Sequence, residues 1–393
     1  MHKLMRRTLV SLSLLALPVV ANASGARVSG LNVPGDYVKD YTGIYTYVSG
    51  VGSVGNLVWA EPGNSGNNAM GAVLGNLWDG KLGTFGVTMR AAAPTLGQPM
   101  FGDPVTTTSV GFGDFNFNGE ALDLMWGHKM GSGSLGLRVN RSFISNEVAA
   151  GTAEGNGNNG RNIWGIGAGF GFAMNSNTDV EISGLFQNRS FSGQNFNTPN
   201  AAEDDGGSTY QIAARAMKKS GSNVVLIPVL KMYSFGRSAV DAAAVTTDET
   251  LSGWSFGLAG NWTLGSDDLF ILGGNFVGNK FEQTVGPNPT TTVNETFYPN
   301  MFMALETHTN SWLTLRFGAQ NAVMFSAKQE VGPATATIKQ HVFSFSTGAT
   351  VKAGSLTFDA TLTPQFFNNP VSATFNNGLG NDPFGRVSAT YSF

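Results

Sequence analysis

Nine ionisable side chains lie on the polar side of segments in which apolar and polar residues alternate. They are Arg90, Asp123, Arg138, Glu181, Arg189, Arg215, Arg316, Asp359 and Arg386. Successive side chains of an extended strand point to opposite faces, so all nine are expected on the face away from the apolar side chains. Charges on such a face can line a water-filled pore and tune which ions pass, or they can pair with one another and fill a closed interior. The sequence leaves both roles open.

The sequence offers little for catalysis or metal binding. It has no cysteine and four histidines, His2, His128, His308 and His341. None of them belongs to a zinc-protease, serine-hydrolase or Cys/His metal motif. The Gly/Asn-rich stretch 155–160 resembles a phosphate loop in composition, but its place between two alternating segments favours a surface loop. We therefore expect a protein that is not an enzyme, with no catalytic residue, no metal site and no cofactor.

The alternating segments are typical of a transmembrane β-barrel, in which one face of each strand contacts lipid and the other faces the lumen. From Trp164 to Met174, for example, large apolar residues alternate with glycine or alanine. Only 12% of the residues are charged, 52 are glycine, and no apolar run after residue 23 is long enough for a membrane helix. Short turns alternate with long connections. We predict an all-β, antiparallel transmembrane barrel of about 16 strands (roughly 14 to 18), with short periplasmic turns and long extracellular loops.

The beginning of the chain is typical of an exported protein. Residues 1–23 combine a basic start, an apolar run and a small-residue end, which predicts a signal peptide cleaved after Ala23. We therefore expect export to the outer membrane, with lipids and lipopolysaccharide around the barrel.

The last strand carries an apolar face up to the final residue. Val387, Ala389, Tyr391 and Phe393 share this face. The ending resembles the C-terminal signal of Gram-negative outer-membrane β-barrels. The resemblance implies that Tyr391 and Phe393 are recognised by the barrel assembly machinery.

An N-terminal segment, 24–53, separates the signal peptide from the barrel, which is predicted to occupy residues 54–393. It can be a periplasmic leader or an extra pair of strands, or it can plug the lumen, as loops and helices do in some larger barrels. The stretches 224–230 and 269–276 are apolar on both faces. We therefore expect part of the lumen wall to be covered, either by a loop folded inward or by this segment.

The signal peptide, the repeated amphipathic strands and residues 386–393 together resemble the broad porin-like class of outer-membrane barrels. The resemblance implies passive diffusion of small hydrophilic solutes or ions through a water-filled pore, in a homotrimer. Two alternatives remain open: a FadL-like channel for hydrophobic compounds with an N-terminal plug, and a closed structural or adhesive surface barrel. The net charge of −3 provides no basic surface for nucleic acid.

Overall fold

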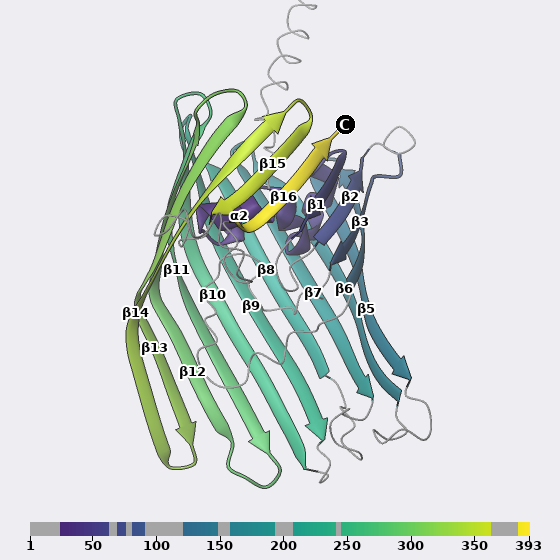
Figure 1. The fold of residues 1–393 in the computed structure, drawn as a ribbon, viewed down its shortest axis with the longest axis vertical. Coiled ribbons are helices and arrows are strands. Elements are labelled where there is room, and N and C mark those ends of the chain that lie inside the picture. Colours follow the sequence, from purple (N-terminus) through teal and green to yellow (C-terminus); the bar gives the residue numbers. More distant parts are fainter. Residues whose placement is uncertain are drawn as a thin grey trace, which may run out of the picture.

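The computed structural model describes residues 24–62, 69–75, 81–90, 121–147, 158–192, 207–240, 245–362 and 384–393. Within them, sixteen antiparallel strands form one closed barrel in which sequence neighbours pair and β1 pairs with β16 (Figure 1). The prediction of an antiparallel barrel of about 16 strands is confirmed. The strands are β1 (Leu57–Glu61), β2 (Ala69–Leu74), β3 (Thr84–Arg90), β4 (Ala121–Met130), β5 (Gly133–Glu147), β6 (Asn158–Asn175), β7 (Thr178–Ser192), β8 (Gly207–Lys219), β9 (Val224–Val240), β10 (Thr246–Leu264), β11 (Asp268–Val285), β12 (Thr291–His308), β13 (Leu313–Val331), β14 (Ala334–Ala353), β15 (Leu356–Leu362) and β16 (Phe384–Ser392).

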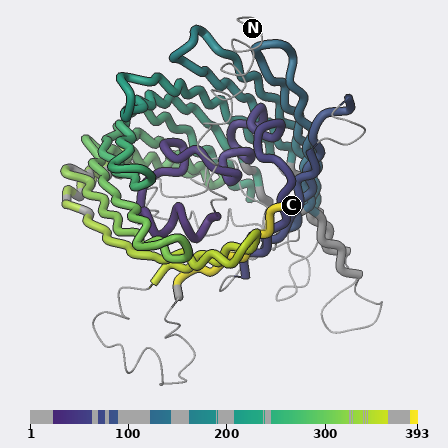
Figure 2. The backbone as a smooth tube through the Cα atoms, turned by 90° about the horizontal axis from the view of Figure 1, so that it is seen from above, coloured from purple at the N-terminus to yellow at the C-terminus, as the bar shows by residue number. Residues whose placement is uncertain are grey.

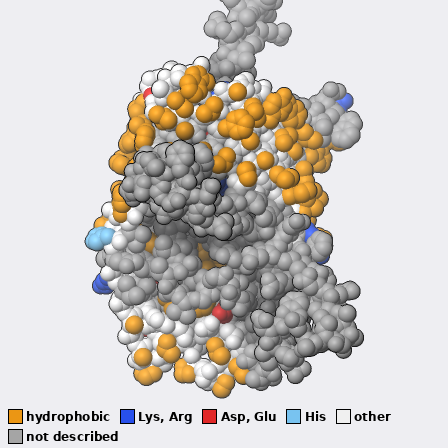
Figure 3. All heavy atoms as spheres, in the orientation of Figure 1, with side chains coloured by type: hydrophobic (Ala, Val, Ile, Leu, Met, Phe, Trp, Pro, Cys, Tyr) orange, Lys and Arg blue, Asp and Glu red, His pale blue; other side chains and the backbone are white. Residues whose placement is uncertain are grey.

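The alternation of side chains places the large apolar residues on the outside of the barrel. On β6, Trp164, Ile166 and Phe170 are exposed, whereas the glycines between them are buried. Figure 3 shows hydrophobic side chains spread over the outer surface at the end of the barrel that carries the short turns, which is its upper half in this view. An exposed apolar surface of this extent is typical of contact with a membrane.

Short turns connect the strands at the upper end of the barrel. Gly131 and Ser132 join β4 to β5, and Gly354 and Ser355 join β14 to β15. Gly131 and Gly354 each have a φ of +63°, which residues with a Cβ atom rarely adopt, so glycine permits these tight connections. At the opposite end, the connections from β3 to β4, β7 to β8 and β15 to β16 lie outside the described residues.

The six strands from β9 to β14 are longer than the sequence predicted. They have 17 to 20 residues each, whereas about 9 to 11 residues suffice to span the apolar layer of a membrane. Long loops were expected at this end of the barrel, but residues 324–337 form the ends of β13 and β14, joined by Gly332 and Pro333. Threonine, serine and lysine occupy positions of the alternating pattern in these strand ends. The strands can continue through them because backbone pairing between strands does not depend on contact with lipid.

The N-terminal segment lies inside the barrel. Residues 24–53, called the inner segment from here on, form the helix α2 (Gly25–Leu31) and the 3-10 helices η1 (Gly35–Tyr37), η2 (Tyr41–Tyr45) and η3 (Val48–Ser53). Seen from above, they cross the interior of the ring of strands (Figure 2). No helix in the described part of the chain is long and apolar enough to cross a membrane.

Short-range hydrogen bonds define the helices of the inner segment. Ser24 caps α2, because its hydroxyl accepts a hydrogen bond from the backbone N–H of Arg27 at 3.1 Å. Asn32 ends the helix in the left-handed conformation. Asp40 caps η2 through the backbone N–H groups of Thr42 and Gly43. These caps let the segment keep a compact, non-strand conformation within a barrel of strands.

Candidate functional site

The charged residues predicted to face the lumen are gathered around the inner segment. Six of them are buried: Asp123, Arg138, Glu181, Arg215, Arg316 and Asp359. Arg386 is partly buried, and its side chain is 17% exposed. The side chains of Arg90 and Arg189 lie outside the described part of the structure. The seven described side chains all form hydrogen bonds and ion pairs within the barrel.

One group of charges holds helix α2 against β12, β13 and β15. Arg27 of the inner segment binds both carboxylate oxygens of Glu306, with Nε to Oε2 at 2.6 Å and Nη2 to Oε1 at 2.7 Å. Arg316 bridges Glu306 at 2.5 Å and Asp359 at 3.0 Å, and the hydroxyl of Ser24 donates to Asp359 at 2.8 Å. Two guanidinium groups thus neutralise two carboxylates, which offsets the cost of burying all four charges.

Glu61 joins the inner segment to the seam at which the barrel closes. It lies on β1, and its carboxylate forms an ion pair with Arg386 of β16 at 2.6 Å. The same carboxylate accepts hydrogen bonds from the backbone N–H of Gly25 at 2.7 Å and from the hydroxyl of Tyr41 at 2.9 Å. The first and last strands of the barrel therefore contact the inner segment through one acidic group.

A second group of charges holds the other half of the inner segment against β4, β5 and β7 to β9. Arg138 pairs with Asp123 at 2.7 Å and donates to the carbonyl of Tyr45 at 2.8 Å. Arg215 pairs with Glu181 at 2.6 Å.

Arg215 also contacts the inner segment. Its guanidinium donates to the carbonyl of Asp36 at 2.9 Å, and it lies 4.0 Å from the ring centre of Tyr47. The carboxylate of Asp36 pairs in turn with Lys231 at 2.6 Å.

Sequence reasoning missed several members of these groups. Glu61, Lys231 and Glu306 are wall residues that were not among the predicted candidates, and Arg27 and Asp36 belong to the inner segment. Lys231 could have been found, because it occupies the same side of its strand as the buried residues Ile227 and Val229.

At several glycines of the wall, the backbone of the inner segment lies in direct contact with the backbone of a strand. A Cβ atom added to Gly318 would lie 1.7 Å from the carbonyl oxygen of Leu31, and one added to Gly136 would lie 2.1 Å from that of Val48. At Gly169 the added atom would be 2.8 Å from the backbone nitrogen of Ser49. Such distances are far below ordinary van der Waals contact, so only glycine lets the two backbones approach this closely.

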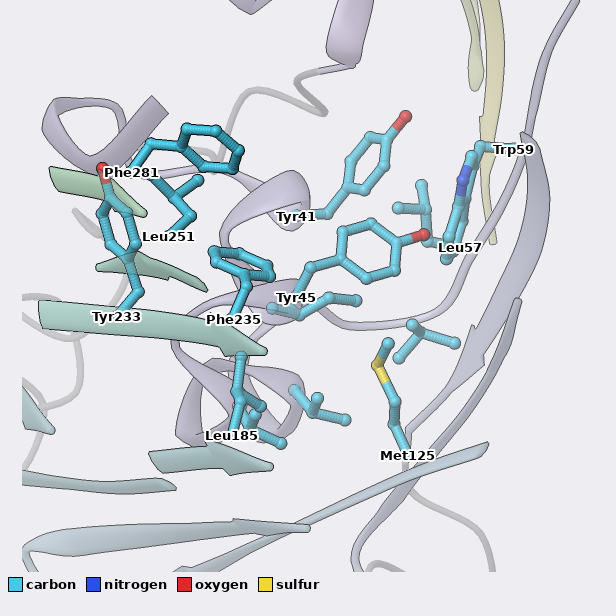
Figure 4. Close-up of a cluster of buried hydrophobic side chains, with 14 of the residues drawn as sticks. Tyr41, Tyr45, Leu57, Trp59, Met125, Leu185, Tyr233, Phe235, Leu251 and Phe281 are labelled. Atoms are coloured by element: carbon cyan, nitrogen blue, oxygen red, sulfur yellow. The ribbon is translucent and has the colours of Figure 1, made fainter. Parts of the chain in front are cut away.

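Packing against the inner segment explains why β9 and β11 are apolar on their inner as well as their outer faces. Ile227 and Val229 of β9 and Ile271 of β11 point inward and pack in one cluster with Tyr37 and Val38 of the inner segment. A neighbouring cluster joins other residues of the inner segment to the wall, as Figure 4 shows. The ten labelled members of that cluster are Tyr41, Tyr45, Leu57, Trp59, Met125, Leu185, Tyr233, Phe235, Leu251 and Phe281.

Asp40 is a buried charge of the inner segment that has no ion pair among the described residues. One of its carboxylate oxygens caps η2, and the other has no hydrogen-bond partner among the described residues. Burial raises the pKa of Asp40 above its ordinary value, although Arg27 and the contacts with Thr42 act in the opposite direction. No cluster of three or more His, Cys, Asp or Glu side chains suited to a metal ion occurs in the described ranges.

Comparison with known proteins identifies no family. No family model matches the chain, and no curated protein matches it. Solved structures that match include FpvA of P. aeruginosa bound to pyoverdines, with a TM-score of 0.42, 10% identity, and coverage of 62% of this chain and 40% of that one.

Two further matches have similar scores. The outer membrane receptor FauA from Bordetella pertussis has a TM-score of 0.45 and 10% identity, with coverage of 70% of this chain and 48% of that one. CdiB from Escherichia coli has a TM-score of 0.44 and 9% identity, with coverage of 86% and 62%. The chain spans less than two thirds of the length of each of these three proteins. The likeness is limited to the barrel fold.

Proposed function

We propose that this chain is an outer-membrane channel for small hydrophilic solutes or ions, and that its own N-terminal segment closes it. The observation that carries the proposal is the position of residues 24–53 inside the lumen, bound to wall residues such as Arg138, Arg215 and Glu306. These are the same side chains that a water-filled pore would expose. In the closed state the wall side chains bind the inner segment, and in the open state the same side chains face water.

The outer surface supports a membrane location for this channel. Leu124, Phe256 and Met301 are examples of large apolar side chains that are exposed on the outside of the barrel. A barrel in lipid requires such an outer face. In this proposal the short turns lie in the periplasm, residues 1–23 direct export, and Tyr391 and Phe393 form the assembly signal. Lipopolysaccharide surrounds the outer rim, and the channel assembles as a homotrimer.

The inner segment can act as a gate because water can take over its polar contacts. A buried ion pair is costly to break when one partner stays buried and unpaired. When the inner segment leaves, however, the lumen fills with water, and groups such as Glu306 and Arg316 remain paired with each other on the wall. The displaced Arg27 becomes solvated as well. Separation of the segment from the wall is therefore far less costly than burial of the same charges without partners.

A FadL-like channel for hydrophobic compounds is the second candidate, because it also has an N-terminal plug. The apolar inner faces of β9 and β11 suggested a greasy pocket. In the structure, these faces pack against Tyr37 and Val38, so the inner segment accounts for them without a hydrophobic cargo. The third candidate is a closed structural barrel. Such a barrel needs no charged wall residues between its strands and the segment that fills it.

Conductance in planar bilayers tests the proposal. Purified full-length protein should give rare openings, and a variant lacking residues 25–53 should give steady, stepwise conductance. Arg27→Met in the intact chain provides a variant that preserves the barrel strands and should open more often than the unaltered protein. If both variants fold, as judged by heat-modifiable migration, and neither conducts, the chain is not a diffusion channel. Uptake of a long-chain fatty acid without ion conductance would favour the second candidate.

A further inference from the structure

One row of paired, inward-facing residues borders the inner segment and continues around the lumen. Following the strand pairing from β5 to β11, it runs through Asn140, Gly165, Gln187, Thr209, Phe235, Leu251 and Phe281. All of its side chains are buried within the barrel. Its first half carries amides and a hydroxyl, whereas its second half carries aromatic and aliphatic groups. We call it the amphipathic row.

The polar half of the row is an ordered chain of hydrogen bonds. Asn140 donates to Asp123 at 3.0 Å, and Gln187 donates to the side-chain oxygen of Asn140 at 3.1 Å. Gly165 lies between the two amides on β6, and a Cβ atom there would come within 2.8 Å of Gln187. The missing side chain therefore allows the two amides to meet across a strand. The chain of hydrogen bonds fixes the orientation of the amide groups before any solute arrives.

Two polar groups beside the aromatic half are buried and lack partners. Thr209 is fully buried, and its hydroxyl has no hydrogen-bond partner within the described ranges. Asn279, two residues before Phe281, is 5% exposed. Its side-chain oxygen accepts from the hydroxyl of Tyr233 at 2.5 Å, but its NH₂ group has no partner among the same residues. Buried polar groups are normally satisfied, so these two groups retain hydrogen-bonding capacity that the hydroxyl groups of a solute would match.

These two groups flank an aromatic pair. Thr209 lies on β8 and Asn279 on β11, while Tyr233 and Phe235 project from β9 with their ring centres 6.0 Å apart. Neighbouring strands are about 4.8 Å apart, which places β8 and β11 roughly 14 Å apart along the wall. A molecule of two small rings can reach both while it covers the aromatic side chains.

Two carboxylates lie beside the aromatic half of the row. Glu249 and Glu295 face inward on β10 and β12 and are buried, and Glu295 is paired in register with Asn279. Carboxylates beside the site disfavour an anionic solute. Aromatic rings, amides and hydroxyl groups suit a neutral molecule that has many hydroxyl groups and an apolar ring face.

We propose that the amphipathic row, together with Asn279 and Tyr233, is a binding site for neutral polyhydroxylated solutes of about disaccharide size. The inference rests on the proposed channel function and adds the class of solute to it. The hydroxyl groups of the solute hydrogen-bond to Thr209 and Asn279, and its C–H faces pack on the rings of Tyr233 and Phe235. A fatty acid matches neither the amides nor the nearby carboxylates.

Equilibrium dialysis with labelled sucrose tests the site independently of conductance. Binding is measured with the full-length protein and with Gly318→Ala, a variant designed to unseat the inner segment, so that access does not limit the result. Thr209→Val and Asn279→Leu remove the polar groups while nearly preserving side-chain volume. Each should weaken sucrose binding by about fivefold, the usual contribution of one hydrogen bond. Thr335→Val, at an exposed position of β14, is the matched control and should have no effect.

The outcomes separate this inference from the channel proposal. Saturable sucrose binding that both variants weaken supports the site, whether or not the protein conducts. The site is refuted if neither protein binds sucrose, if both variants bind it as the control does, or if decanoate binds more tightly than sucrose. A conducting protein that shows any of these results remains a channel without this site.

Discussion

Replacement of Gly318 by alanine should open the channel without disturbing the barrel. The added Cβ atom would lie 1.7 Å from the carbonyl oxygen of Leu31, whereas ordinary contact begins at 3.4 Å. Helix α2 must therefore withdraw by about 1.7 Å, because both obstructing atoms at Leu31 belong to the backbone. Gly318 is not among the residues with positive φ, so alanine fits the strand itself.

The structure sets the magnitude of this effect. A withdrawal of about 1.7 Å breaks the hydrogen bond from Gln320 to the carbonyl of Asn32, now 2.7 Å, and the pair between Arg27 and Glu306, now 2.6 Å. Overpacking of this kind costs about 1 to 3 kcal/mol. The ratio of unseated to seated inner segment should therefore rise by roughly 5- to 150-fold.

Single-channel recording measures this ratio as open probability. Gly136→Ala should act in the same direction, because its Cβ atom would lie 2.1 Å from the carbonyl oxygen of Val48 at the other end of the inner segment. Gly184→Ala is the matched control, since no atom lies within 4 Å of its added Cβ. Unchanged open probability in folded Gly318→Ala and Gly136→Ala would refute the idea that the seating of this segment closes the channel.

Three further predictions concern stability, the pH dependence of channel opening, and assembly. Asp123→Leu leaves the buried Arg138 without its carboxylate and should destabilise the protein by about 3 to 5 kcal/mol in urea unfolding, whereas addition of Arg138→Met should restore most of the loss. Because burial raises the pKa of Asp40, the seated state binds its proton more tightly; seating is strongest below the ordinary aspartate pKa and weakens as pH rises through the raised value. Asp40→Asn, which keeps the cap, should therefore reduce openings at neutral pH and have no effect in acid; equal openings at neutral pH would contradict this reasoning. Phe393→Ser should lower the amount of folded barrel in the outer membrane, measured by heat-modifiable migration in cell envelopes, and normal assembly would show that the terminal aromatic group is not read.

The barrel was predictable because period-two alternation has a direct physical cause. In the proposed membrane setting one face of each strand meets lipid, so residues such as Trp164 and Ile166 must be apolar, while their neighbours need not be. The lengths of β9 to β14 were not predictable in this way. Beyond the apolar layer both faces tolerate polar residues, and the pattern that marks a strand then also fits a loop.

The partners of the charged residues were not predictable from alternation. Parity placed Arg138 and Arg215 on the inner face, but their contacts with Tyr45 and Asp36 depend on how the inner segment folds. That segment forms a short α-helix and three 3-10 helices, so no strand-like alternation shows which of its side chains point to the wall. The apolar inner faces of β9 and β11 were the indirect signs that something covers the wall.

The glycines of β6 connect closure of the lumen with the path of a solute. Gly169 lies beneath Ser49 of the inner segment, and Gly165, four residues away on the same inward face, lets Gln187 reach Asn140. Glycine at these inward positions leaves room in the lumen. In the closed state the inner segment fills one part of that room, and the polar half of the amphipathic row fills the other. Withdrawal of the inner segment would uncover Gly169, four residues along β6 from the row, so the movement that opens the channel would also widen the lumen beside the polar half of the row.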